Sequence, residues 1–427
     1  MNNWKLKKID ECAEVIGGGT PSTSNVEFWN GDIPWLTPKD LSGYSYRYIK
    51  KGERNISEEG LKKSSARLLP EGSVLFTSRA PIGYVAIAKN PVTTNQGFKS
   101  LVLKDNNVSE FFYYLLKNNK DYIESFSSGS TFKEISGGAL KELKFNIPPP
   151  SEQKAIADIL GSLDDKIELN RQMNKTLEDM AQAIFKSWFV DFDPVKAKAE
   201  GRTIEGLSQE IFDLFPDSFE ESELGTIPKG YIIEPLDKIA NYLNGLALQK
   251  FPPDSETEYL PAIKIAELKN GIKETTGKAS TKIKPEYIID DGDVIFSWSA
   301  SLVVDIWCEG KGALNQHLFK VTSKDYPKWF YYFWTKYFLE KFTAIAADKA
   351  TTMGHIKREH LTDAKVLIPC DKLINESNKI FEPLINEIIG LRVQTRTLSK
   401  MRDSLLPKLI SGEIRVPEAE KFIEDRA

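Results

Sequence analysis

The side chains best suited to chemistry in this sequence are a few carboxylates and two histidines in its second half. Asp305, Glu309 and Lys311 are of the residue types that form nuclease carboxylate clusters. Their spacing is compressed and the first half of the chain has no counterpart, so we interpret them as a surface hairpin. His355 and His360 do not share a helix face, which makes them poor joint ligands for a metal ion. We expect no catalytic residue and no metal site.

The short motifs of common cofactor sites are also missing. The sequence has no Asn-Pro-Pro-Tyr-like tetrad for flipping and methylating adenine, and no Gly-x-Gly-x-x-Gly. It has no Gly-x-x-x-x-Gly-Lys-Ser/Thr loop for nucleotide phosphates, and Gly17-Gly18-Gly19-Thr20 is a turn with the wrong spacing. The sequence therefore predicts a chain whose polar side chains bind rather than react.

Two long helices must position those side chains. In each, apolar residues recur in alternating steps of three and four, which is the seam of a coiled-coil helix. The first seam is Ile156, Leu160, Leu163, Ile167, Asn170, Asn174, Leu177, Ala181, Ile184 and Trp188. The second is Phe381, Leu384, Ile388, Leu391, Thr395, Leu398, Arg402, Leu405 and Leu409.

The ends and pairing of these helices follow from the same pattern. Ser151, after three prolines, is the expected N-cap of the first helix. Pro383 either kinks the second helix or occupies its first turn. Two matching seams favour an antiparallel pair related by a pseudo-twofold axis, with the polar seam residues fixing the register. Alternatively, each helix packs only against its own globule.

The stretches before each helix resemble each other, so the chain contains an internal repeat. PEGSVLFTSRA at 70–80 matches DDGDVIFSWSA at 290–300, and TTNQGFK at 93–99 matches ALNQHLF at 313–319 with the same offset. In the first copy we expect strands at 33–36, 73–76, 84–88 and 99–103, and a helix at 110–117. Two similar globules on a rigid spacer suit a ligand with two similar sites, and duplex DNA presents groove faces about every 34 Å.

Four repeated loops carry side chains that could contact DNA, since bases are read by Arg, Lys, Ser, Thr, Asn and Gln held on a rigid frame. In the first half the candidates are Lys39, Ser78, Arg79, Ser130, Thr131 and Lys133. In the second half they are Lys264, Ser297, Trp298, Ser299, Lys349, Thr351, Thr352, His355 and Lys357.

Each candidate has a structural alternative. The Asn-Gln pair at 95–96 recurs at 315–316, so it is better explained by stabilisation of the fold than by base reading. Halves that read different sequences should differ at the readers, which favours Arg79 against Ser299. Trp298 could be a core residue, and the Ser/Thr/Lys loops could be phosphate contacts or solvated turns. The aromatic runs at 111–114 and 329–334 are expected to be core.

Composition sets the remaining bounds. The chain has 427 residues with a formal charge of −4, which by itself counts against a nucleic-acid binder. Many of the acidic residues fall in the first long helix and the stretch after it, away from the candidate loops. Three distant cysteines and no apolar span or signal peptide predict a cytoplasmic protein without a membrane segment.

With these features the sequence resembles the DNA-specificity subunit of type I restriction–modification systems. The resemblance covers nearly the whole chain and is most specific at PPSEQ (149–153), SLDDKIELN (162–170), FKSWFVDFDPV (185–195) and LLPKLISGEI (405–414). The second helix lacks the Ser-Glu-Gln start. The resemblance implies two target-recognition domains that each read one half of a bipartite, asymmetric site in double-stranded DNA.

The resemblance also implies partners and cofactors. Two methyltransferase (modification) subunits would carry S-adenosylmethionine and methylate adenine, and restriction subunits would use ATP and Mg²⁺; this chain would hold no cofactor. The helices would dock the methyltransferase subunits. The expected partner-binding residues are Ile156, Leu163, Ile167, Leu177, Ile184, Trp188, Leu391, Leu398 and Leu405.

The expected fold is α+β, with two homologous α/β domains separated by two long helices paired as an antiparallel coiled coil. The expected segments are a first recognition domain (1–150), a first helix (151–190), a linker (191–229), a second recognition domain (230–370), a second helix (371–412) and a tail (413–427). Two other functions stay open, namely a self-contained enzyme that modifies or cleaves DNA and a coiled-coil scaffold that never touches DNA.

Overall fold

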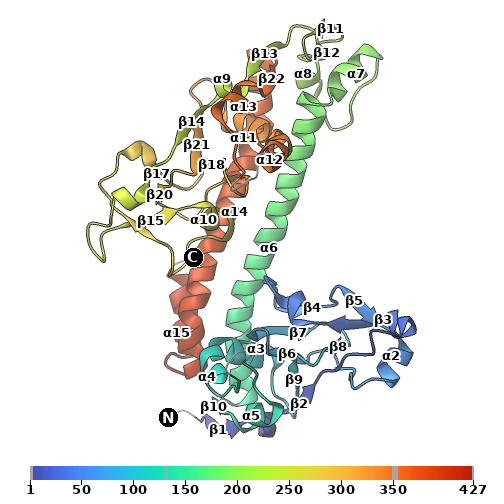
Figure 1. The fold of residues 1–427 in the computed structure, drawn as a ribbon. Coiled ribbons are helices and arrows are strands. Elements are labelled where there is room, and N and C mark those ends of the chain that lie inside the picture. Colours follow the sequence, from blue (N-terminus) through green and yellow to red (C-terminus); the bar gives the residue numbers. More distant parts are fainter. Residues whose placement is uncertain (1–2, 130–132, 349–353, 426–427) are drawn as a thin grey trace. The chain divides into compact units, whose positions relative to one another are not determined.

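The computed structural model describes residues 3–129, 133–348 and 354–425, and the chain divides into two compact units. Unit 1 comprises Met1–Leu169 and Thr397–Ala427, and unit 2 comprises Asn170–Arg396. Each unit thus contains one globule and one part of each long helix (Figure 1). Within the described ranges, no helix is both long and apolar enough to cross a membrane.

The globule of unit 1 is built on a five-stranded sheet with the order β2-β9-β6-β7-β4. Its elements are β1 (Lys5–Lys8), α1 (Ile9–Cys12), β2 (Ala13–Gly17), η1 (Val26–Phe28), β3 (Trp29–Leu36), η2 (Pro38–Leu41), β4 (Tyr48–Ile49), β5 (Arg54–Ile56), α2 (Glu58–Lys62), β6 (Val74–Ser78), β7 (Ile82–Ala88), β8 (Thr93–Thr94), β9 (Lys99–Leu103), α3 (Ser109–Asn118), α4 (Lys120–Ser125), α5 (Gly137–Glu142) and β10 (Lys144–Ile147). Smaller sheets form from β5-β3-β8 and β1-β10. The four predicted strands and the predicted helix are confirmed, with ends shifted by a few residues.

The five-stranded sheet is buried on both faces, which explains the unbroken apolar run of β6. Val74 and Phe76 face the core formed with α3, whereas Leu75 points into a second cluster on the opposite face. The aromatic residues of α3 are buried against the sheet, so the prediction that they form core is confirmed.

Unit 2 repeats this plan. Its sheets are β14-β21-β18-β19, which corresponds to β2-β9-β6-β7, and β16-β15-β20-β17, together with the pairs β13-β22 and β11-β12. Its elements are α7 (Asp193–Ala199), α8 (Gln209–Phe212), β11 (Phe219–Ser222), β12 (Gly225–Pro228), β13 (Ile232–Pro235), α9 (Leu236–Ile239), β14 (Asn241–Asn244), η3 (Leu248–Lys250), β15 (Leu260–Ile263), α10 (Ile265–Asn270), β16 (Lys278–Ala279), η4 (Pro285–Tyr287), β17 (Ile288–Ile289), β18 (Val294–Ser297), β19 (Val303–Ile306), β20 (Gly312–Leu314), β21 (Leu318–Thr322), α11 (Lys328–Tyr337), α12 (Leu339–Asp348), α13 (Arg358–Thr362) and β22 (Lys365–Ile368). In both units one parallel strand pair, β3–β8 or β15–β20, occupies the same place in the order. The internal repeat is therefore confirmed at the level of topology.

The segment 191–229, which we predicted to be a linker, contains α7, α8 and the β11–β12 hairpin. Val195 and Phe215 are almost fully buried in the core of unit 2. The Phe215 ring lies 5.7 Å from that of Trp188 at the end of the first long helix. Because its apolar residues are buried this way, the segment forms part of unit 2.

The two long helices are α6 (Pro150–Phe189) and α14 (Asp371–Ser411), and a short α15 (Val416–Glu424) follows. Ser151 lies inside α6 and so does not cap it, because the helix already begins at Pro150. Pro383 lies well inside α14, so it does not occupy the first turn of this helix. Pro383 is exposed, so the backbone position that lacks an N–H donor lies outside the core.

Within each unit the segments of α6 and α14 pair in antiparallel sense, as predicted. In unit 2, Asn170 Nδ2 donates to Gln394 Oε1 at 2.8 Å, and the rings of Phe189 and Phe381 lie 6.3 Å apart. In unit 1, Leu160 and Leu163 share one core cluster with Leu405, Leu409 and the globule. The seam residues therefore pair the two helices and also attach them to the globules. Both packing arrangements that the sequence left open are present.

Candidate nucleic-acid interface

In unit 1 three of the four predicted loops meet at the end of strand β6. Ser78 lies at this point, where its backbone N–H donates to the Gly97 carbonyl at 2.7 Å and its carbonyl accepts from Ile135 N–H at 3.0 Å. The next residue, Arg79, forms an isolated β-bridge with Glu134. The loop after β6, the turn at 95–97 and the segment 133–135 are therefore held together by backbone hydrogen bonds.

Unit 2 brings the corresponding loops together in the same way. The backbone N–H of Trp298 donates to the His317 carbonyl at 3.4 Å, and its carbonyl accepts from Ile356 N–H at 3.0 Å. Ser299 forms an isolated β-bridge with His355, which matches the bridge between Arg79 and Glu134. The same backbone frame thus presents different side chains in the two units.

The first predicted loop is a helix start in both units. Thr37 and Asp40 close a capping box at η2, and Lys264 N–H donates to Glu267 Oε2 at 3.1 Å at α10. This loop adjoins the Asn-Gln turn, because Asn95 N–H donates to the Leu36 carbonyl at 2.8 Å. All four loops are therefore neighbours in unit 1.

The Asn-Gln turn stabilises the fold, as predicted. Asn95 Oδ1 accepts the Gly97 N–H at 2.8 Å, and Asn315 Oδ1 accepts the His317 N–H at 3.3 Å. Gly18 packs so closely here that a Cβ atom would lie 2.0 Å from the Asn95 carbonyl oxygen. This close approach, rather than phosphate binding, explains the glycine run that starts at Gly17.

Three predicted contacts are buried hydroxyls. Ser78 and Ser297 are fully buried and Ser299 is 5% exposed. Ser78 Oγ donates to the Gly97 carbonyl at 3.1 Å and Ser297 Oγ to the Ser301 carbonyl at 2.8 Å. These side chains hold the loops together and are not expected to reach a base edge.

The half-buried Trp298 has contacts expected of a core residue and contacts expected of a surface residue that could meet DNA. Its indole N–H donates to Asn244 Oδ1 at 2.9 Å, and its ring lies 5.9 Å from Phe319 of the core. The same ring lies 5.7 Å from His317 and 6.3 Å from the exposed His355. Trp298 therefore joins the core to the outer surface of the loop cluster.

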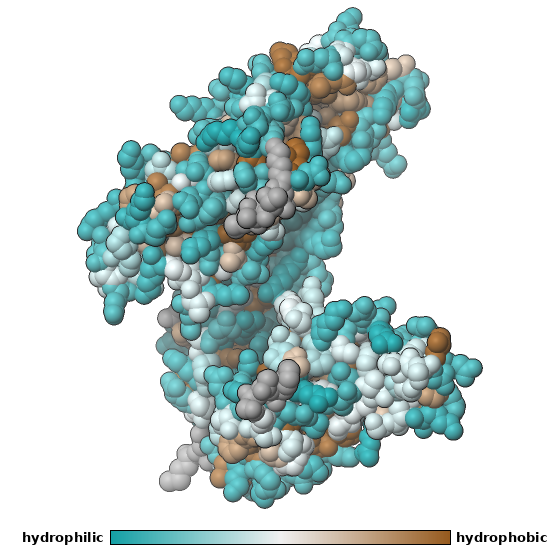
Figure 2. All heavy atoms as spheres, viewed as in Figure 1, coloured by the Kyte–Doolittle hydropathy of each residue, from teal (hydrophilic) through white to brown (hydrophobic). Residues whose placement is uncertain are grey.

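Three of the exposed lysines of these loops have an acidic neighbour. Lys39 pairs with Glu53 at 2.9 Å and Lys133 with Glu124 at 2.9 Å. The hydrogen bond and charge of Glu53 raise the pKa of Lys39, and those of Lys133 lower the pKa of Glu124. Lys357 pairs likewise with Glu359 at 3.2 Å, and Lys264 is exposed at the start of α10. Paired cations make these surfaces weaker attractors of phosphate than the lysines alone would be. The viewed face in Figure 2 is mostly hydrophilic.

Five predicted contacts lie outside the described residues: Ser130, Thr131, Lys349, Thr351 and Thr352.

Asp305, the first residue considered for catalysis, has a structural role. Asp305 Oδ1 accepts from Arg392 Nη1 at 2.8 Å, which ties strand β19 to α14. Among the residues that the structure describes, no group of three His, Cys, Asp or Glu could hold a metal ion.

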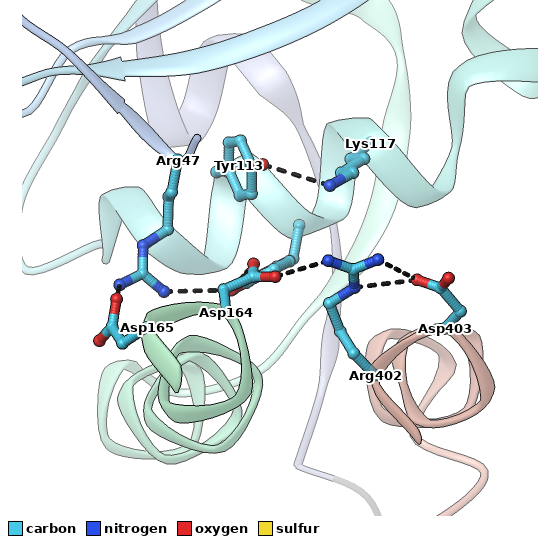
Figure 3. A network of polar contacts seen from close by, with 8 residues as sticks. Arg47, Tyr113, Lys117, Asp164, Asp165, Arg402 and Asp403 are labelled. Carbon is cyan, nitrogen blue, oxygen red and sulfur yellow. Dashed lines mark hydrogen bonds and ion pairs between the residues drawn. The ribbon is translucent and has the colours of Figure 1, made fainter. Parts of the chain in front are cut away.

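Helix α6 is fixed to the globule of unit 1 by a polar network that the sequence did not reveal (Figure 3). Asp164 Oδ1 accepts from Arg402 Nη1 of α14 at 2.7 Å, and Oδ2 accepts from the Tyr114 hydroxyl at 2.6 Å. Arg47 donates to the Tyr114 hydroxyl at 3.1 Å and to Asp165 at 2.6 Å. Burial and the charge of Asp164 raise the pKa of Tyr114, so its hydroxyl stays protonated and donates.

The start of α6 has a similar anchor. Gln153 is 1% exposed, and its side chain accepts from Val108 N–H at 2.9 Å and donates to the Pro148 carbonyl at 3.0 Å. The preceding Glu152 pairs with Arg415 at the start of α15. Glu152 and Gln153 of the Ser-Glu-Gln motif therefore attach the start of α6 to other parts of unit 1.

The nine seam residues expected to bind partners are used within the chain. Ile156, Leu163, Ile167, Trp188, Leu391 and Leu405 are buried, and Leu177, Ile184 and Leu398 are partly buried against the cores. A partner chain would therefore meet other faces of these helices.

Comparison with known proteins identifies the family. A family model for the type I restriction modification DNA specificity domain matches residues 1–179 and 228–395. The MjaIX specificity subunit of a type I restriction enzyme from Methanocaldococcus jannaschii is 37% identical, with 97% of this chain and 94% of the relative covered. The HindI specificity subunit from Haemophilus influenzae is 26% identical, with 97% and 100% covered.

A solved structure shows the same fold. The S subunit of a type I restriction-modification system from M. genitalium superposes with a TM-score of 0.58 at 17% identity, covering 96% of both chains. The match of the family model to both halves of the chain agrees with the duplicated loop frame and the paired helices of the structure. The chain belongs to the family of type I restriction–modification DNA specificity subunits.

Proposed function

We propose that this chain is the DNA-recognition and assembly subunit of a type I restriction–modification complex. Each globule reads one half of a bipartite, asymmetric site in duplex DNA. The chain contributes no chemistry of its own, holds no cofactor, and acts in the cytoplasm with methyltransferase and restriction subunits.

The observation that carries the proposal is one loop frame built twice with different side chains. In each unit the backbone bonds at the end of β6 or β18 are the same, and the bridging pair is Arg79–Glu134 in one and Ser299–His355 in the other. Two related globules that read different half-sites need the same loop frame with different exposed side chains.

In this proposal Arg79, Trp298 and His355 are the candidate base contacts, because they are at least partly exposed on the loop clusters. The exposed lysines Lys39, Lys133, Lys264 and Lys357 are candidate phosphate contacts. Ser130, Thr131, Lys349, Thr351 and Thr352 stay in the candidate set.

The long helices are proposed to space the two globules and to dock the methyltransferase subunits. A helix of 40 residues is about 60 Å long, which exceeds one turn of DNA. On unit 2, Met173 and Met180 of α6 are 37% and 49% exposed, although Asn174 and Ala181 of the seam beside them are buried. Flexible methionine side chains on an exposed helix face suit contact with a partner protein.

Three of these lysines, Lys39, Lys133 and Lys357, are paired with acidic residues, which supports a shared role of this chain and its partner subunits in phosphate binding. Since their acidic neighbours offset their charge, this chain alone should bind DNA weakly, and the partner subunits should supply part of the phosphate contacts. The affinity of the complex should fall steeply with salt.

The test is to express the chain with its modification subunits in a host without N6-adenine methylation and to map N6-methyladenine. We expect an asymmetric motif of two short half-sites with an unread spacer. Exchange of residues 1–150 for those of a relative should change one half-site and leave the other intact. An unaltered motif would favour a scaffold that leaves DNA reading to other chains.

A second assay addresses a self-contained enzyme. The purified chain is incubated with DNA, Mg²⁺ and S-adenosylmethionine. We expect neither methyl transfer nor cleavage, and turnover without partners would overturn the non-catalytic role.

A further inference from the structure

The matched β-bridge of the two units carries a charge pair in one unit and none in the other. In unit 1, Arg79 Nη1 donates to Glu134 Oε2 at 3.2 Å, and the second carboxylate oxygen lies 3.6 Å from Lys99 Nζ. In unit 2 the same positions hold Ser299 and His355. Glu134 was not among the sequence-predicted contacts, and only its position beside Arg79 singles it out.

The geometry around Glu134 fixes its carboxylate and leaves the guanidinium accessible. Lys99 is 18% exposed and holds one carboxylate oxygen from the side of the sheet, whereas the Arg79 and Glu134 side chains are 38% and 36% exposed. The hydrogen bond to Glu134 uses one of several guanidinium N–H donors of Arg79. The following residue, Ala80, has a φ of 53°, which turns the chain sharply away just after Arg79.

An arginine in this position has one preferred base. Guanidinium groups donate two parallel hydrogen bonds to O6 and N7 of guanine, which is the commonest specific contact in the major groove. A carboxylate that already fixes the side chain reduces the rotamer freedom lost on binding. It also weakens the attraction of the same arginine to phosphate, which favours base reading over backbone contact.

We propose, building on the proposed function, that Glu134 is the positioning residue that aims Arg79 at a guanine in the half-site read by unit 1. Unit 2 lacks this device. Its Ser299 hydroxyl is buried 3.1 Å from His317 Nδ1, and the bridge partner His355 carries an imidazole. The two half-sites therefore differ at the base pair that faces this bridge.

The test uses the complete methyltransferase complex and duplexes that carry its mapped motif. Each guanine of the motif is replaced in turn by 7-deazaguanine, which lacks only the N7 acceptor. At one guanine of one half-site we expect about a ten-fold loss of affinity for the unchanged complex. Arg79→Ala should bind the normal and the deaza duplex equally well.

The variants of Glu134 separate positioning from simple electrostatics. Removal of an acid beside DNA should by itself strengthen non-specific binding. If Glu134 aims Arg79, Glu134→Ala should instead lower the ratio of specific to non-specific affinity by about ten-fold, even as non-specific binding rises. Glu134→Gln should fall between, and Arg79→Lys, which keeps the charge without the planar fork, should lose most of the discrimination.

Lys133→Gln is the matched control, because it removes a neighbouring cation from an exposed pair with Glu124. It should weaken binding to all sequences equally. If no guanine shows the combined effect of Arg79→Ala and 7-deazaguanine, or if Glu134→Ala leaves the specificity ratio unchanged, the inference is overturned. A complex that methylates no bipartite motif would instead overturn the proposed function itself.

Discussion

Replacement of Arg402 by methionine tests whether the polar network in Figure 3 attaches the paired helices to the globule of unit 1. Methionine keeps much of the side-chain volume and removes the charge. The variant leaves Asp164 with the Tyr114 hydroxyl at 2.6 Å but without the guanidinium at 2.7 Å. Burial lowers the pKa of Arg402, but the charges of Asp164 and Asp403 and the hydrogen bonds to them outweigh it and raise the pKa above its ordinary value.

The expected cost follows from the burial of the pair. Removal of one partner of a buried ion pair costs about 3–5 kcal/mol, because the other charge stays uncompensated. The side chains of Arg402 and Asp164 remain 16% and 14% exposed, so water recovers part of this loss. We expect unit 1 to lose about 2–3 kcal/mol of stability. Lys154→Met, in an exposed pair with Asp158 on the same helix, should cost no more than about 0.5 kcal/mol.

Native-state hydrogen exchange measures this loss locally, because a chain with two units need not unfold in one step. Slowly exchanging amides of residues 150–169 and 397–411 should exchange about 30- to 160-fold faster in Arg402→Met. Residues 371–396 should keep their protection. If both helix segments keep the protection of the unchanged protein, the network does not stabilise unit 1 and the reasoning fails.

Four further outcomes are expected. Asn174→Leu should raise the free energy of unfolding by about 1 kcal/mol in urea titrations, since the buried Asn174 carbonyl oxygen has no hydrogen-bond partner among the described residues; a loss of stability would show that this amide is satisfied. Burial raises the pKa of the Cys308 thiol to about 11, so the folded state keeps a proton that the unfolded chain loses near pH 8.5. The free energy of unfolding should therefore fall between about pH 8.5 and 11 by at most ~1.4 kcal/mol per pH unit from this group, and this fall should be smaller in Cys308→Ala. The exposed Cys370 should be the cysteine that reacts first with a thiol reagent in the native protein. Lys133→Gln should reduce the slope of log affinity against log salt by about 1 in the complex without changing the methylated motif, and an unchanged slope would remove Lys133 from the phosphate contacts.

The sequence was sufficient for features that depend on local spacing. The steps of three and four from Ile156 to Trp188 predicted α6 because helix periodicity is a property of neighbouring residues. Comparison of the two halves predicted the duplicated topology and the structural role of Asn95 and Asn315. Each of these predictions follows from residues close together in the chain or from comparison of one segment of the sequence with another.

Tertiary structure decided which polar residues face outward. Ser78 and Arg79 are adjacent in sequence, but strand pairing buries the first and exposes the second. The partner of Arg79 is Glu134, and that of Asp164 is Arg402, far along the chain in each case. Such pairings depend on how strands and helices separated by many residues come together, and no local pattern encodes that choice.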